Sequence, residues 1–248
     1  MPMTIRIAMW SGPRNISTAM MRSFGARPDT AVSDEPFFGA YLKLTGAPHP
    51  MSAETIASMD CDFGSVLGAV SGEAPGGEAI WYQKHMAHHM VGDVGIGDMP
   101  EHRHAFLIRT PERVAASYAA KNELSQPEVL GYGILRRYFE AEAERLGKAP
   151  AVIDADDVLQ DPAGTLEALC SALGIPWSEA MLSWKKGPHR QDGVWGAHWY
   201  QSVNASTTFA PPPKTMPTLT PEHQAIAEAC RADYQKLHRY RLRRSEHG

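Results

Sequence analysis

TIRIAMWSGPRNISTAMMRSF, residues 4–24, is an apolar run followed by a Gly-Pro break and a helix-like segment. The apolar run predicts a buried strand, and the segment that starts at Ser17 predicts a helix. A strand that enters a helix through a tight loop forms a phosphate-binding loop, because free backbone N–H groups and the positive end of the helix dipole face the anion. This stretch therefore predicts an α/β fold with an anion-binding loop near residues 12–18.

The side chains of this loop define the kind of anion site. Ser17 and Thr18 can cap the helix or donate hydroxyls to the anion, and Arg14 carries a guanidinium that suits oxyanions. A nucleoside-triphosphatase loop has Lys directly before the Ser/Thr pair, whereas Ile16 stands there in this chain. We expect a loop that binds phosphate but does not hydrolyse ATP, formed by Gly12, Pro13, Arg14, Asn15, Ile16, Ser17 and Thr18.

Short apolar runs alternate with helical patterns along the rest of the chain, which predicts a P-loop-type three-layer α/β/α fold with a mostly parallel central sheet. The expected strands are 4–10, 30–33, 79–83, 104–108 and 150–154. The expected helices are 17–25, 36–44, 111–121, 126–147, 161–173 and 221–242. We expect one domain over 1–248, with 45–77 as a flap or a surface insertion that has one short helix near 53–60, and with 185–220 irregular.

The composition is that of an ordinary globular protein. The net charge of −4 and the pI near 6.3 argue against nucleic acid as a partner. The three cysteines lie far apart in the sequence and fit reduced thiols, and no apolar run approaches the roughly 18 residues that span a bilayer. We expect a cytoplasmic protein with no membrane partner and leave the oligomeric state open, with a homodimer as one candidate.

A second candidate anion site follows the predicted strand 104–108. Arg109 ends this strand, and Ser117 lies two turns into the helix that follows. Loops at the carboxyl ends of parallel strands are where α/β sheets bind ligands, so Arg109 and Ser117 could share an anion. Taken alone, the segment would be interpreted as an exposed arginine and a helical serine, with no shared ligand.

A third group of polar residues follows the strand 79–83. Lys84 and His85 end this strand, and His88 comes one turn later. The two histidines could bind a metal, or one could be a catalytic base. We expect no metal, because no Cys, Asp or Glu accompanies them at ligand spacing.

A late basic segment, Lys185-Lys186-Gly187, lies among tryptophans. Cations and aromatic rings on a loop with Gly and Pro suit a phosphate with a stacked base. The alternative is a lysine-rich surface loop whose tryptophans fill the core.

Together, these motifs resemble the sulfotransferase family in nearly the whole chain and in the right order. That family uses 3′-phosphoadenosine 5′-phosphosulfate as its donor. Its P-K-S-G-T-T loop, R-x-P-x5-S, R-K-G and K-T-H motifs correspond here to Pro13-Arg14-Asn15-Ile16-Ser17-Thr18, to Arg109, Pro111 and Ser117, to Lys185-Lys186-Gly187, and in part to Lys84-His85. The variant SGPRNIST loop with Asp34-Glu35-Pro36 resembles a branch that includes domains labelled branched-chain aminotransferase-like.

The resemblance implies a sulfotransferase that acts on a hydroxyl or amine of a small-molecule acceptor. It implies that the loop at 12–18 holds the 5′-phosphosulfate and that Arg109, Ser117, Lys185 and Lys186 hold the 3′-phosphate. Arg14 stands where the family has Lys; because the pKa of arginine is above about 12, Lys84 is the alternative proton donor to the leaving group.

The resemblance leaves the base open between two residues. Glu35 matches the position of a catalytic Glu in several branches, and His85, with His88 as a further candidate, lies near the catalytic His of others. We favour Glu35, because the His register is shifted by one residue. Two other functions compete with this one: a P-loop nucleotide kinase-like phosphotransferase, and a non-catalytic nucleotide-binding module on the same fold.

Overall fold

The computed structural model describes residues 4–243 as two compact units. Within the described residues, unit 1 comprises 4–9, 18–104 and 178–209, and unit 2 comprises 10–17, 105–177 and 210–243. The chain passes from one unit to the other inside two strands, β1 (Ile5–Ser11) and β4 (Arg103–Ile108). The prediction of one domain over 1–248 stays a prediction.

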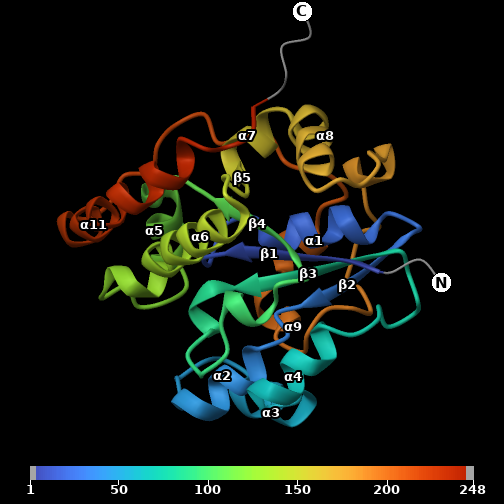
Figure 1. Ribbon diagram of the computed structural model, residues 1–248. Helices are drawn as coiled ribbons and strands as arrows, with labels where there is room; N and C mark the ends of the chain where they lie inside the picture. Colours follow the sequence, from blue (N-terminus) through green and yellow to red (C-terminus); the bar gives the residue numbers. More distant parts are fainter. Residues whose placement is uncertain (1–3, 244–248) are drawn as a thin grey trace, which may run out of the picture. The chain divides into compact units, whose positions relative to one another are not determined.

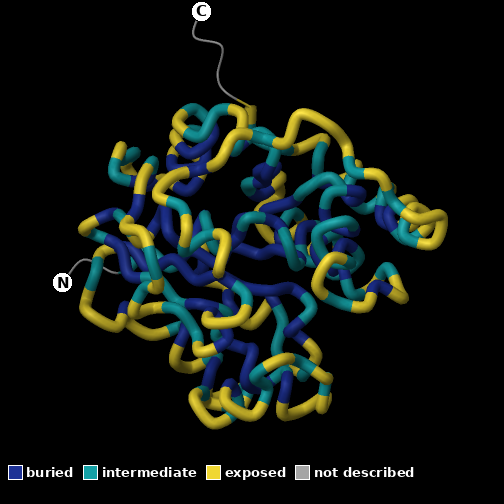
Figure 2. The backbone as a smooth tube through the Cα atoms, turned by 180° about the vertical axis from the view of Figure 1, so that it is seen from behind, coloured by how far each residue is buried: buried dark blue, intermediate teal, exposed yellow. Residues whose placement is uncertain are grey.

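The described residues form one five-stranded sheet in the order β2-β3-β1-β4-β5 (Figure 1). The remaining strands are β2 (Thr30–Asp34), β3 (Ile80–Met86) and β5 (Ala151–Asp154). The pairs β2–β3 and β4–β5 are parallel. All seven residues of β3 are buried, and the inner strands are drawn dark blue in Figure 2. The predicted α/β class with a parallel sheet flanked by helices is confirmed.

Unit 1 contains helices on both sides of β2 and β3 (Figure 1). Phe24 of α1 stacks on Tyr82 of β3 with ring centroids 4.2 Å apart, whereas the amide of the next residue, Gln83, donates to Val70 O of α4 at 2.8 Å. Successive strand residues point to opposite faces, so α1 covers one face of β3 and α4 the other. The helices of this unit are α1 (Ser17–Gly25), α2 (Phe38–Thr45), α3 (Ser52–Ser58), α4 (Phe63–Val70), η1 (Ala87–His89), η2 (Ile96–Asp98), η4 (Glu179–Leu182), α9 (Gly196–Trp199) and α10 (Gln201–Asn204).

In unit 2, α11 packs against α5 and α6, and α7 and α8 pack against β5. Val114, Leu130 and Tyr132 belong to the buried cluster that joins α5, α6 and α11. The helices of this unit are α5 (Pro111–Ala119), η3 (Pro127–Leu130), α6 (Tyr132–Leu146), α7 (Ala155–Gln160), α8 (Pro162–Ala172) and α11 (Pro221–His238).

Two segments differ from the sequence-based expectation, a third largely matches it, and α7 is a helix that the sequence does not predict. The segment 45–77 contains two helices, α3 and α4, and Val66 and Val70 bury one side of α4. The helix expected over 126–147 is interrupted at Gly131, whose φ of 77° fits neither the 3₁₀ turn before it nor α6 after it. The segment 185–220 is irregular apart from the short helices α9 and α10.

Candidate functional site

The predicted anion loop has an unusual backbone. Arg14 and Ile16 have φ angles of 63° and 56°, in the left-handed region that a β-branched residue such as Ile16 rarely adopts. A Cβ on Gly12 would lie 2.3 Å from Leu130 O, so no larger residue fits there. Backbone conformations of this kind cost about 1–3 kcal/mol each and gather at ligand sites. The surroundings must therefore hold the loop in shape.

Three hydrogen bonds within unit 2 hold it. The side-chain amide of Asn15 donates to Leu107 O of β4 at 3.2 Å. Arg109 Nη1 donates to Arg14 O at 3.1 Å, and Arg14 Nε donates to Ser117 Oγ at 2.9 Å. The structure thus brings together Arg14, Arg109 and Ser117, which the sequence predicts to bind two different phosphates of one donor.

The two guanidinium groups of this cluster repel each other. Burial and the charge of Arg109 lower the pKa of Arg14. Burial also lowers the pKa of Arg109, although Asp156 counteracts it. Arg109 Nε is buried without a hydrogen bond and lies 3.9 Å from Asp156 Oδ1. A cluster with excess positive charge and a free buried N–H suits an oxyanion.

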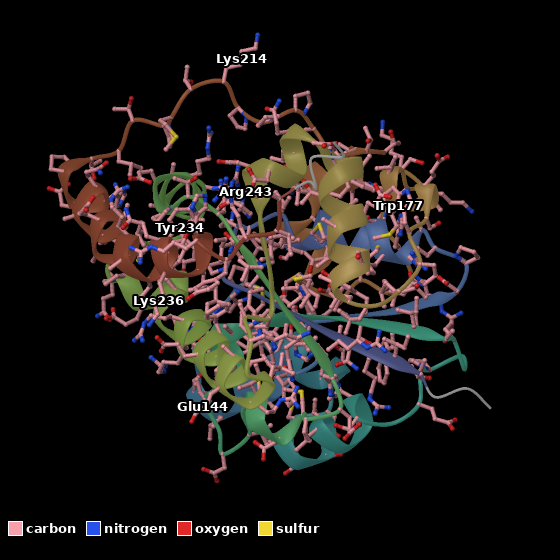
Figure 3. The ribbon with its side chains drawn as sticks, turned by 45° about the horizontal axis from the view of Figure 1, so that its top comes forward. Glu144, Trp177, Lys214, Tyr234, Lys236 and Arg243 are labelled. Atoms are coloured by element: carbon pink, nitrogen blue, oxygen red, sulfur yellow. The ribbon has the colours of Figure 1, made fainter. Side chains whose placement is uncertain are left out.

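A cavity of about 320 Å³ opens beside this cluster, within unit 2. Arg113 fixes its far wall, because its guanidinium donates to Pro213 O at 3.0 Å and to Thr215 O at 3.3 Å. Figure 3 shows Lys214 on the outside of this loop. The sequence predicts only that 185–220 is irregular and gives no sign that part of this segment walls a cavity. The lining residues are Arg109, Arg113, Ala116, Ser117, Pro213, Thr215 and Pro217.

A second charged cluster lies within unit 1, where β2 and β3 end. The register of the two strands pairs Asp34 with Lys84. Lys84 Nζ donates to Asp34 Oδ1 at 2.8 Å, to Glu35 Oε1 at 2.6 Å and to Tyr200 OH at 2.7 Å. Glu35 has a φ of 49°, and its backbone N–H donates to Lys84 O at 2.9 Å. A third non-glycine residue in the left-handed region thus lies at a predicted site position.

Burial and charge set the proton affinities in this cluster. Burial raises the pKa of Glu35; Lys84 opposes this effect and Asp34 adds to it. Burial alone would lower the pKa of Lys84, but Asp34 and Glu35 raise it well above its usual value. Lys84 therefore stays charged, while Glu35 has the raised proton affinity that suits a general base near neutral pH.

Neither histidine that the sequence predicts as an alternative base takes part in the ion pair between Lys84 and Glu35. His85 follows Lys84 on the strand and points to the opposite face, where its Nε2 lies 3.1 Å from Gln83 Oε1. Burial lowers the pKa of His88 to about 4. His89, which follows His88 in the sequence, has Nδ1 at 3.9 Å from Glu35 Oε2, and burial holds its pKa well below the usual value. The structure groups Lys84 with Glu35 rather than with His85, and the identity of the base stays a prediction.

The late basic segment lines a different cavity. Lys185 and Lys186 border a cavity of about 820 Å³ in unit 1, together with Gly25 and Ala26 at the C-terminal end of α1. The backbone N–H of Gly187 donates to Asn204 O at 2.9 Å. Arg109 and Ser117 belong to unit 2, so a shared role for Lys185, Lys186 and Gly187 in binding the 3′-phosphate stays a prediction.

No group of three or more His, Cys, Asp or Glu side chains within residues 4–243 could hold a metal ion. No helix in the same range is long and apolar enough to cross a membrane.

This chain is similar to a protein-family model, to two plant proteins and to solved structures. A family model described as "Sulfotransferase domain" matches residues 5–238. Two Arabidopsis thaliana proteins, branched-chain-amino-acid aminotransferase-like proteins 2 and 1, are 36% and 37% identical over 224 and 222 residues, which is 90% of this chain. The chain spans about 40% of the length of these relatives.

Solved structures share the fold at low sequence identity. The sulfotransferase domain of the Synechococcus PCC 7002 olefin synthase has a TM-score of 0.55 and 16% identity, over 92% of this chain and 95% of that one. A sulfotransferase from Alicyclobacillus acidocaldarius has a TM-score of 0.54 and 13% identity, over 96% and 97% of the two chains.

Proposed function

Because the chain belongs to the sulfotransferase domain family, we propose that it transfers a sulfuryl group from 3′-phosphoadenosine 5′-phosphosulfate to a hydroxyl or amine of a small-molecule acceptor. The observation that carries this proposal is the hydrogen bond between Arg14 Nε and Ser117 Oγ, with Arg109 bonded to Arg14 O. It joins the loop expected to hold the 5′-phosphosulfate to the motif expected to hold the 3′-phosphate. A donor with two anionic ends matches this arrangement.

The residues fit such a donor chemically. The free Arg109 Nε and the repulsion between Arg14 and Arg109 both favour a multiply charged oxyanion. Ser117 adds a hydroxyl, and the backbone N–H groups at the start of α1 add dipoles that favour negative charge. When bound, the donor supplies the sulfuryl group. Fixed cations provide charge neutralisation that a kinase obtains in part from Mg²⁺.

The cluster in unit 1 supplies the acid–base chemistry. Glu35 accepts the proton of the acceptor hydroxyl or amine, and its raised pKa suits that role. Lys84 keeps its charge and donates from a fixed position, so it can stabilise negative charge that develops during transfer. Arg14 remains a binding cation, because a guanidinium cannot give up its proton near neutral pH.

Titration calorimetry with three nucleotides tests the donor assignment. We expect adenosine 3′,5′-bisphosphate to bind more tightly than adenosine 5′-phosphate or MgATP. Arg109→Ala should weaken bisphosphate binding by about 10–100-fold, as expected for loss of a charged hydrogen bond, and affect adenosine 5′-phosphate far less. Arg137→Ala, which removes an exposed arginine of the same unit, is the control. Equal losses for both nucleotides would contradict the 3′-phosphate assignment.

A screen of acceptors with a radiolabelled donor then tests transfer itself. We expect label to appear in a hydroxyl- or amine-bearing small molecule only when the wild-type protein and the sulfated donor are both present. Tight bisphosphate binding without transfer to any acceptor, and without hydrolysis of the donor, would favour the non-catalytic alternative.

A further inference from the structure

The ammonium group of Lys84 uses all of its hydrogen-bonding capacity inside the protein. It has three N–H donors, and they meet Asp34 Oδ1, Glu35 Oε1 and Tyr200 OH at 2.6–2.8 Å. Lys84 is 1% exposed. It is therefore fixed by three partners at once, and only one of these is the candidate base.

Asp34 is held as tightly as Lys84. Its carboxylate accepts from Lys84 Nζ, from Tyr200 OH at 2.8 Å and from the backbone N–H of Gly193 at 3.1 Å. Its side chain is 1% exposed. Tyr200 OH in turn accepts from Trp195 Nε1 at 3.0 Å. Neither the predicted mechanism nor the motifs of the sequence give Asp34 a role.

The charges around Glu35 do not cancel. Two carboxylates, Asp34 and Glu35, share one ammonium, so the group carries one excess negative charge. The other titratable groups that face Glu35 are Tyr200, whose pKa burial raises well above its usual value, and His89, whose pKa burial holds well below its usual value. Both are therefore neutral near pH 7 and supply no second cation.

We propose that Asp34 is a positioning residue of this site, which binds Lys84 jointly with Tyr200 and so prevents that cation from neutralising Glu35. The inference rests on the proposed function, in which Glu35 is the base. If Lys84 paired with Glu35 alone, the ammonium would lower the pKa of Glu35 too far for it to accept a proton near neutral pH. Shared between two carboxylates, Lys84 keeps its place and its charge while Glu35 keeps the proton affinity that a general base needs.

Nuclear magnetic resonance of protein labelled with ¹³C at the glutamate carboxyl carbons tests this without an activity assay. The Glu35 signal is the one that disappears in Glu35→Gln, and its midpoint of titration with pH is measured in each variant. Asp34→Asn retains an oxygen that accepts from Lys84 and removes the competing charge. We expect it to move the midpoint about one pH unit toward acid. The acid limb of the kcat/KM profile should move with it.

Two further variants complete the test. Tyr200→Phe removes the hydroxyl that accepts one N–H of Lys84, so that this N–H can donate to the carboxylates instead. This change should move the Glu35 midpoint in the same direction by a smaller amount. Asp29→Asn is the control, because Asp29 also pairs with a cation, Arg27, but at the other end of β2. It should leave the midpoint unchanged.

The outcomes separate this inference from the proposed function. An unchanged or more alkaline midpoint in Asp34→Asn overturns the role of Asp34. If that variant does not fold, an unchanged or more alkaline midpoint in Tyr200→Phe overturns it instead. If the midpoint moves toward acid but the wild-type protein transfers no sulfuryl group, the role of Asp34 in tuning Glu35 holds and the proposed function fails.

Discussion

The two charged clusters of this protein have opposite electrostatics. In unit 2, Arg14 and Arg109 are cations whose charges repel, and burial lowers the pKa of both. In unit 1, Lys84 lies between Asp34 and Glu35 and binds both at 2.8 Å or less. The first cluster has an excess of positive charge, whereas the second has two carboxylates for one ammonium and is fully hydrogen-bonded at its cation.

This difference suits the two proposed roles, donor binding in unit 2 and proton transfer in unit 1. A cluster that must attract an anion works best with positive charge that its own protein does not neutralise. A cluster that must move a proton needs fixed distances between its donor and acceptor atoms. A buried ammonium that donates to three acceptors is held at such distances and cannot move. The comparison predicts that variants of unit 1 change turnover or stability and that variants of unit 2 change donor affinity.

The largest expected effect is the loss of turnover in Glu35→Gln. The amide keeps an oxygen for Lys84 Nζ but cannot accept the proton of the acceptor. Loss of a general base lowers kcat by about 10²–10⁴-fold. Steady-state kinetics at saturating donor measure this effect.

Affinity for adenosine 3′,5′-bisphosphate provides the control for that variant. Glu35→Gln should bind the bisphosphate like the wild type, whereas Arg109→Ala should lose affinity. Near-normal turnover in Glu35→Gln would transfer the role of base to His85 or His88, the alternatives that the sequence leaves open.

The cluster in unit 2 could be predicted from the sequence because its parts are local. The Gly-Pro break before Ser17 predicts the loop, and Arg109 and Ser117 follow one strand end at short range. The spacing could not predict that Arg14 and Ser117 are bonded to each other, since 103 residues separate them. The left-handed conformation of Ile16 also opposes its intrinsic preference, so only the tertiary contacts explain it.

The cluster in unit 1 is harder to predict, again because residues far apart in the sequence form it. The sequence identifies Glu35 and Lys84 as strand-end residues, but Tyr200 lies 116 residues from Lys84 and carries no motif of its own. The sequence could not show that His85 points to the face of β3 opposite Lys84, because adjacent strand residues look equivalent until their faces are known. Helix α4 was missed because its Gly-rich composition resembles a loop, although Val66 and Val70 pack in the interior.

The next largest effect is on stability, and it contrasts the two clusters directly. Lys84→Met leaves two buried carboxylates without their cation, which should lower the free energy of unfolding by about 3–5 kcal/mol. Arg14→Met removes one hydrogen bond but also relieves the repulsion from Arg109. We expect it to change the free energy of unfolding by less than about 1 kcal/mol. Urea denaturation of both variants measures the difference, and equal losses would show that the two clusters are not electrostatically distinct.

The last effect concerns pH and begins with the buried histidines of unit 1. Burial lowers the pKa of His88 and His102 to about 4. It also lowers the pKa values of His85 and His89 well below the usual value. The unfolded chain takes up these protons near pH 6.5, whereas the folded unit takes up those of His88 and His102 only near pH 4 and those of the other two well below the usual value. Stability is therefore lost as the pH falls from about 6.5 toward 4, by at most about 1.4 kcal/mol per group and pH unit. Glu35, whose pKa is raised, opposes this with one group against four.

Unit 2 should respond to acid in the opposite direction through Asp154. Burial raises the pKa of this carboxyl to about 6, so the folded unit binds its proton before the unfolded chain does, and its contribution to stability increases as the pH falls from about 7 toward 4. Hydrogen exchange at pH 7 and pH 5, corrected for the intrinsic rate, can follow the two units through separate peptides. Protection should fall in peptides of β3 and be maintained in peptides of β5. Equal loss in both would mean that the units open together, and that the histidines of unit 1 control the acid stability of the whole chain.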